Sequence, residues 1–159
     1  MNLNTKLFLG LVLLSLGALV ALSVNHYAEK KDDQKLVNDF PKEQQPMIVA
    51  MREAERTGSM SDESWNKMIG WVKSEDADRA AFALSALMEE RNTSRRAQIA
   101  PLATAIALTP PVTDADGYLR CKAIITLKNI GDPDWKSYAK AILEQDKRAL
   151  VQESIKPLL

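Results

Sequence analysis

The sequence predicts an all-α protein, a short α-solenoid of helical pairs behind an N-terminal transmembrane helix. Residues 7–24 form a Leu-rich run without a charged side chain. From residue 46 onwards, Ala- and Leu-rich segments with helical spacing alternate with short turns that contain Gly, Pro or Asp. Apolar positions in several of these segments superpose after a simple shift, which is typical of stacked helical repeats.

The N-terminal run is long enough to cross a membrane. At about 1.5 Å per residue it spans roughly 27 Å, close to the thickness of the hydrocarbon core. The residues expected to span the membrane include Leu7, Leu9, Leu11, Leu14, Leu16, Leu19, Leu22 and Val24. A cleaved signal peptide is an open alternative, because Ala21-Leu22-Ser23 offers a weak cleavage pattern, and a buried helix of a soluble protein is another.

The flanking charges give conflicting indications of orientation. Lys6 precedes the run, and Lys30, Lys31 and Lys35 follow it, so a count of positive charges favours a C-terminal domain inside the cell. A short tail with one Lys before an apolar run is also how exported proteins begin. We expect a single-pass membrane protein with its C-terminal domain outside the cytoplasm, in the periplasm.

Three regions follow from these patterns: a membrane anchor or signal peptide at 1–24, a polar linker at 25–45 and a helical repeat domain at 46–159. Within the repeat domain we expect helices over 46–56, from 61, over 77–91, up to 108, over 118–130, from 133 and over 147–158. Asp132 and Asp146 are the expected N-caps of the last two helices, with Pro133 in the first helical position. Glu89 and Glu90 are expected to be solvated.

Two shifts superpose the helices. A shift of 40 aligns Ala83, Leu84 and Leu87 with Ala123, Ile124 and Leu127. A shift of 28 aligns Arg120, Ala123, Leu127 and Ile130 with Arg148, Val151, Ile155 and Leu158. A period near 30 residues with one longer insertion, the loop 109–115, fits an α-solenoid.

One repeat carries a recognisable motif. Its residues are Asp114, Asp116, Arg120, Ala123, Leu127 and the tetrapeptide Ile130-Gly131-Asp132-Pro133. This pattern resembles the short HEAT repeats of the phycobilisome-lyase-like group, over about 85 residues of the chain. The resemblance implies that Arg and Asp side chains at the turns, Arg148 included, join neighbouring repeats. It gives no reason to transfer a lyase activity, because nothing in the sequence marks a bilin site.

Composition argues against catalysis and against nucleic acid. The 21 basic side chains equal the 21 acidic ones, whereas nucleic-acid binding usually requires a basic excess. Cys121 and His26 are the only residues of their types, so no cysteine- or histidine-based catalytic or metal constellation is expected. We therefore predict a protein that is not an enzyme and holds no cofactor and no metal.

These inferences favour a non-catalytic, membrane-anchored interaction or scaffold protein of bacterial type, such as an accessory subunit of a larger membrane complex. Its partners would be membrane-associated proteins and, through the anchor, the lipid bilayer. The alternative is an exported, soluble solenoid that binds proteins after signal-peptide cleavage.

Two surfaces are expected to contact a partner. The second helix of each HEAT pair lines the concave side, which would display Arg95, Arg96, Gln98, Lys136 and Lys140. The last helix lacks a following helix to cover its apolar residues, Leu150 and Leu159 among them. The alternative for this end is that one apolar face packs on the preceding repeat and leaves little exposed.

Overall fold

The computed structural model describes residues 34–159 and confirms the all-α prediction for them, since they contain helices and no strand. The chain divides into two compact units, residues 1–41 and 42–159. Of the first unit, residues 34–38 are helical, inside the predicted linker. The predicted membrane-spanning residues 7–24 lie outside the described part. Within residues 34–159, no helix is both long and apolar enough to span a bilayer.

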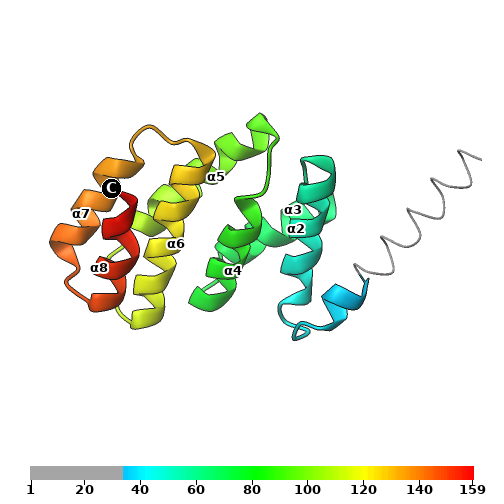
Figure 1. Ribbon diagram of the computed structural model, residues 1–159, viewed down its shortest axis with the longest axis horizontal. Coiled ribbons are helices and arrows are strands. Elements are labelled where there is room, and N and C mark those ends of the chain that lie inside the picture. The colour runs from blue at the N-terminus through cyan, green and yellow to red at the C-terminus, as the bar shows by residue number, and fades with distance from the viewer. Residues whose placement is uncertain (1–33) are drawn as a thin grey trace, which may run out of the picture. The chain divides into compact units, whose positions relative to one another are not determined.

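The second unit consists of consecutive helices (Figure 1). Their bounds are α2 Gln45–Thr57, α3 Asp62–Val72, α4 Ala77–Leu87, α5 Thr93–Leu108, α6 Asp114–Ile130, α7 Trp135–Gln145, α8 Ala149–Ile155 and the 3-10 helix η1 Lys156–Leu158. Helices α2 and α6 each end at a glycine in the left-handed conformation, Gly58 at φ 79° and Gly131 at φ 80°. Side chains with a β carbon are strained in this conformation, so these two glycines stop their helices.

Local hydrogen bonds explain where several helices begin. The Ser61 hydroxyl accepts from the backbone N–H of Ser64 at the start of α3. Asn92 accepts from two backbone N–H groups at the start of α5. Helix α6 begins at Asp114 because Thr113 and Asp116 form a reciprocal capping box.

Four predicted boundaries were wrong. Helix α4 ends at Leu87 instead of residue 91, and α6 begins at Asp114 instead of residue 118, so Asp114 and Asp116 lie in its first turn. Helix α7 starts at Trp135, so Asp132 and Pro133 precede it, and Asp132 accepts from the backbone N–H of Asp134 instead of capping the helix. Helix α8 starts at Ala149, so Asp146 lies too early to be its N-cap.

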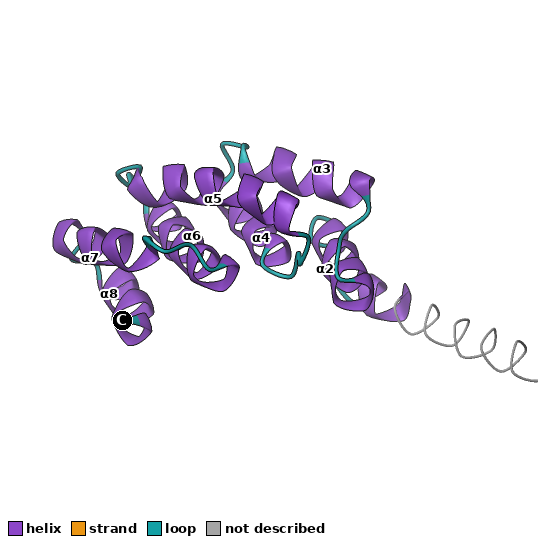
Figure 2. Ribbon diagram, turned by 90° about the horizontal axis from the view of Figure 1, so that it is seen from above, coloured by secondary structure: helices purple, strands orange, loops and turns teal. Residues whose placement is uncertain are grey.

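The helices pack in two rows (Figure 2). Helices α2, α4, α6 and α8 contact one another in that order, and α5 contacts α7 on the other side. Across the rows, α3 packs on α4, and α5 packs on α6.

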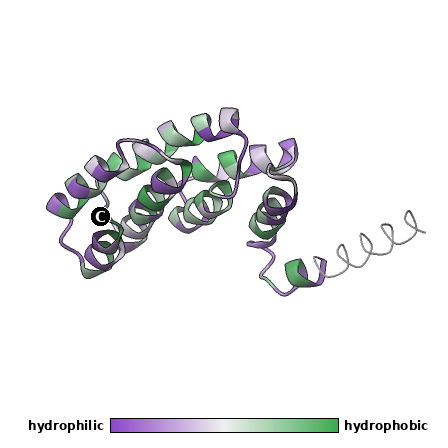
Figure 3. Ribbon diagram, turned by 45° about the horizontal axis from the view of Figure 1, so that its top comes forward, coloured by the Kyte–Doolittle hydropathy of each residue, from purple (hydrophilic) through white to green (hydrophobic). Residues whose placement is uncertain are grey.

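The core follows the repeat positions. Eight of the apolar residues that the two shifts align, all in α4, α6 and α8, have no exposed surface, whereas Ile130 and Leu158 are half-buried: the eight are Ala83, Leu84, Leu87, Ala123, Ile124, Leu127, Val151 and Ile155. Colouring by hydropathy shows the apolar stripes of these helices (Figure 3). In α5 the fully buried positions are Ile99, Ala103 and Ala107, whereas Leu102 and Ile106 are only half-buried. Burial of these aliphatic side chains stabilises the packing of α4, α5, α6 and α8 on one another.

Candidate functional site: a groove beside the α5–α6 loop

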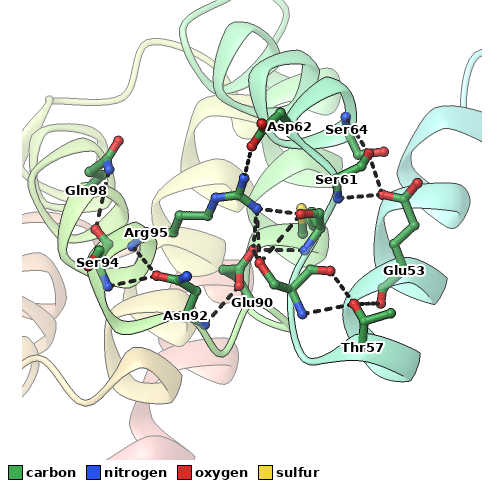
Figure 4. Close-up of polar contacts among 12 residues, drawn as sticks. Glu53, Thr57, Ser61, Asp62, Ser64, Glu90, Asn92, Ser94, Arg95 and Gln98 are labelled. Carbon is green, nitrogen blue, oxygen red and sulfur yellow. Dashed lines mark hydrogen bonds and ion pairs between the residues drawn. The ribbon is translucent and has the colours of Figure 1, made fainter.

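Two polar networks join the turns between the helices, and they differ in how completely their donors are used. The first surrounds Glu90, whose side chain is fully buried just after α4 (Figure 4). Its carboxylate accepts from the backbone N–H groups of Asn92 at 2.9 Å and Met60 at 3.0 Å, and from the Ser59 hydroxyl at 3.1 Å. Arg95 adds an ion pair at 3.4 Å. We refer to Ser59, Met60, Glu90, Asn92 and Arg95 as the closed network.

The Arg95 guanidinium is held from several sides. It donates to the Met60 carbonyl, the Ser59 hydroxyl and the exposed Asp62 carboxylate, and lies 5.1 Å from the centre of the Trp65 ring. Burial would raise the pKa of Glu90, but the hydrogen bonds it accepts outweigh burial and hold its pKa below the ordinary value. The closed network therefore ties the α2–α3 loop to the start of α5 by a charged, hydrogen-bonded centre.

The second network centres on Asp146, between α7 and α8. Both carboxylate oxygens of Asp146 bind Arg148, at 2.9 Å from Nε and 2.6 Å from Nη2. Arg148 Nη1 reaches the Thr113 carbonyl and the Asp114 carboxylate at the start of α6. The hydrogen bonds from Arg148 lower the pKa of Asp146 and raise that of Arg148, so both stay charged.

Arg120 completes this second network, but its guanidinium is used only in part. Its side chain is 3% exposed, and its Nε donates to the Ala107 carbonyl at 2.9 Å. Its Nη1 lies 3.6 Å from Asp146, which is too long for a hydrogen bond. No other acceptor among residues 34–159 meets Arg120. We refer to Thr113, Asp114, Arg120, Asp146 and Arg148 as the open network.

Gly117 makes room for the open network. A β carbon at this position would lie 2.6 Å from Arg148 Nη2 and 2.8 Å from Arg148 Cζ. The absence of a side chain on the first part of α6 therefore allows the Arg148 guanidinium to lie against the helix and reach Thr113.

The open network borders a groove on either side of the α5–α6 loop. One part, the polar cleft of about 410 Å³, is lined by Pro110, Pro111, Val112, Arg120, Gln145, Asp146 and Arg148. The adjoining apolar cleft of about 220 Å³ is lined by Ile106, Thr109, Pro110, Val112, Asp116, Leu119 and Arg120. We call the two together the loop groove. Pro110, Val112 and Arg120 line both clefts, and Val112 is 92% exposed.

The expected concave basic patch is only partly present. Arg95 belongs to the closed network and is 16% exposed, so it is not displayed on a free surface. Arg96 is half-buried and donates to the carbonyl of Asn129. Gln98, Lys136 and Lys140 are exposed, and Lys136 lies 5.7 Å from the Trp135 ring. The prediction of a patch that includes both arginines was therefore wrong, because packing between helices uses their guanidinium groups.

The last helix exposes part of its apolar surface. Leu150 is 42% and Leu159 46% exposed, while Val151 and Ile155 are fully buried. Helix α8 contacts both α6 and α7. The main apolar face of α8 thus packs on α6 and α7, and Leu150 and Leu159 remain partly exposed at this end.

Sequence analysis missed three residues that define the site. The prediction that Glu90 is solvated was wrong, because two loops donate backbone N–H groups to it. Gly117 lies before the helix predicted from residue 118, and Val112 lies in the predicted loop 109–115, so the sequence singled out neither residue. Gly131, Asp132 and Pro133 lie at the α6–α7 turn, outside the groove lining.

Cys121 and the possible metal ligands are further reactive groups of the described part. Cys121 is buried, and burial raises the pKa of its thiol, which disfavours the nucleophilic thiolate. Within residues 34–159, no three His, Cys, Asp or Glu side chains lie close enough together to hold a metal ion.

Comparisons with protein-family models, curated proteins and solved structures found no match.

Proposed function

We propose that this chain is a non-catalytic, membrane-anchored interaction or scaffold protein whose residues 46–159 form a short α-solenoid of HEAT-like repeats. The observation that carries the proposal is the serial contact of α2, α4, α6 and α8, with α3, α5 and α7 packed against them. In an α-solenoid each helical pair stacks on the next in this manner, and the resulting extended surface binds other proteins. The loop groove offers groups suited to binding: two arginines, two acidic side chains and apolar side chains.

The uncharged run at 7–24 supports attachment to a membrane. An anchor limits the domain to partners at or near the same membrane, which favours a role as an accessory subunit of a membrane complex. We propose that the domain lies outside the cytoplasm, in the periplasm. An exported, soluble binding protein is the alternative if the run is a cleaved signal.

Purification of the full-length protein from native membranes in mild detergent tests the proposal, with mass spectrometry of both the N-terminal peptide and the co-purified proteins. We expect the 7–24 peptide to be retained and one or more membrane proteins to be present in a fixed ratio. A mature N-terminus near residue 24 and release into the soluble fraction would overturn the anchored form. Purification without any stoichiometric protein would overturn the role as a subunit.

A further inference from the structure

We infer that the loop groove binds an extended segment of a partner protein in which an internal Asp or Glu stands beside a bulky aliphatic or aromatic side chain. This inference rests on the proposed function, because it names the kind of partner segment and the surface that receives it. The groove lies within the second unit, between the α5–α6 loop, α6 and the α7–α8 turn.

The unused donors of Arg120 supply the first argument. A guanidinium carries five N–H donors in a fixed fork, and buried polar groups normally find hydrogen-bond partners. The Arg120 side chain is only 3% exposed, yet only its Nε donates to an acceptor of the described chain. Since Arg120 lines both clefts, the donors on its two terminal nitrogens are available to an acceptor that enters the groove.

The charge of the polar cleft supplies the second argument. Arg120, Arg148 and Asp146 line this cleft, and Arg148 is also paired with Asp114 at 3.2 Å, so two acids balance the two arginines. Asp146 directs its shortest contacts to Arg148, at 2.6 and 2.9 Å, and so neutralises Arg148 more effectively than Arg120. A carboxylate is the acceptor that complements a guanidinium best, because the two can form parallel charge-assisted hydrogen bonds.

The apolar cleft fixes the rest of the ligand. Ile106, Val112 and Leu119 line it, and Val112 is almost fully exposed on a loop that Pro110 and Pro111 make stiff. An aliphatic or aromatic side chain of the partner would cover this surface.

Asp116 sets the direction of the bound segment. This carboxylate borders the apolar cleft and accepts from the backbone N–H groups of Val112 at 3.1 Å and Thr113 at 2.7 Å. Those hydrogen bonds keep its pKa low, so its negative charge persists at neutral pH. A partner carboxylate is therefore repelled from the apolar cleft and attracted to the unused donors of Arg120, while the neighbouring apolar side chain occupies the apolar cleft.

Selection from a library of random twelve-residue peptides, displayed so that their C-termini are not free, tests the inference. The target is the full-length chain in lipid nanodiscs. We expect enriched peptides to carry Asp or Glu within two residues of Leu, Ile, Val or Phe. Replacement of that acid by its amide should weaken binding about tenfold, because the charge-assisted hydrogen bonds to Arg120 are lost.

Matched variants locate the binding surface. Val112→Glu should weaken binding of the enriched peptide at least about tenfold, because it removes an apolar contact and repels the acid. Val49→Glu, at an exposed position of α2 that does not line the loop groove, should leave binding unchanged. Arg120→Lys should weaken binding of the acidic peptide more than binding of its amide version. Circular dichroism verifies that the variant is folded.

Three results would overturn the inference: no enrichment, enrichment of peptides without an acid, or binding that is insensitive to Val112→Glu. If Leu150→Glu, and not Val112→Glu, abolishes binding of the enriched peptides, the loop groove is not the binding site, although the interaction function still stands. If the membrane purification yields stoichiometric partners but no peptide binds the loop groove, the proposed function is supported and the inference about the groove is wrong.

Discussion

The closed and open networks of this domain use the same chemistry for different ends. Both lie at turns between packed helices, and both place an acidic side chain opposite an arginine. Around Glu90 the carboxylate is surrounded by donors from two loops, and Arg95 has acceptors on both of its terminal nitrogens. Around Asp146 the acid is saturated by Arg148, and Arg120 retains donors beside the groove. A saturated network holds loops together, whereas an unsaturated one can also receive a ligand.

Loss of the central acid of the closed network should have the largest effect on stability. Glu90→Gln removes the charge opposite Arg95 and leaves at least one of two backbone N–H groups facing an amide donor. We expect a loss of about 3 kcal/mol in the free energy of unfolding, because the buried carboxylate is the shared acceptor of the Met60 and Asn92 backbone N–H groups and of Arg95, and an amide cannot accept from all of them. Urea unfolding of the full-length chain in mild detergent, followed by tryptophan fluorescence, measures this loss. A loss below about 1 kcal/mol would show that the network is not a structural centre.

The open network should be less sensitive. Arg148→Ala removes its hydrogen bonds to Asp146, Thr113 and Asp114, but Arg120 remains opposite Asp146. We expect a loss of about 1–2 kcal/mol in the same unfolding assay, since a charge partner persists. A loss that equals or exceeds that of Glu90→Gln would contradict the distinction between the two networks.

Acid should weaken both networks in a defined order. The pKa values of Glu90 and Asp146 are both depressed in the folded protein, from ordinary values of 4.5 and 3.8. Depressed carboxylate pKa values contribute stability that is complete above the unfolded pKa and is lost as the pH falls through the folded pKa. Stability should therefore decline below about pH 4.5, and Glu90→Gln should flatten the start of this decline. An unchanged pH profile in the variant would assign the acid dependence to other groups.

Gly117 gives a finer test of the open network. Gly117→Ala places a methyl group against the Arg148 guanidinium, and the displacement should cancel most of the roughly 1 kcal/mol that Ala gains over Gly inside a helix. In an Arg148→Ala background the obstacle is gone, so the same change should stabilise the protein by about 0.5–1 kcal/mol. Equal effects of Gly117→Ala in both backgrounds, measured by urea unfolding, would mean that Arg148 does not depend on the glycine.

Val112 should show the smallest effect on stability. Its side chain is 92% exposed, so Val112→Ser should change the free energy of unfolding by less than about 0.5 kcal/mol. A larger loss would indicate that the α5–α6 loop packs on another part of the protein, which would remove the basis for a ligand-accessible groove.

Much of the helical core follows from the sequence alone. The repeat positions in α4, α6 and α8 are buried as their spacing predicts, because apolar periodicity reports which face of a helix is covered. The starts of α6, α7 and α8 were misplaced because Asp can cap a helix, form a turn or bind an arginine, and only the surrounding chain decides between these roles.

The loop groove could not be predicted from the sequence for a physical reason. Arg120 and Arg148 align under a shift of 28, which indicates equivalent structural roles. In the folded chain Arg120 is buried, whereas the Arg148 side chain is 30% exposed and saturates the shared Asp146. Which arginine retains unused donors depends on distances of a few tenths of an ångström between three turns. Sequence spacing does not contain that information.

Site-specific photo-crosslinking in native membranes tests the central claim most directly, namely that the open network marks a surface that binds protein. A photoreactive amino acid replaces either Val112 in the loop groove or Val49 on α2 in the full-length chain. The account predicts that position 112 yields a discrete adduct with a protein, that an excess of an acidic–apolar peptide suppresses it, and that position 49 does not yield it. The absence of an adduct at position 112, or identical adducts at both positions, would contradict the account.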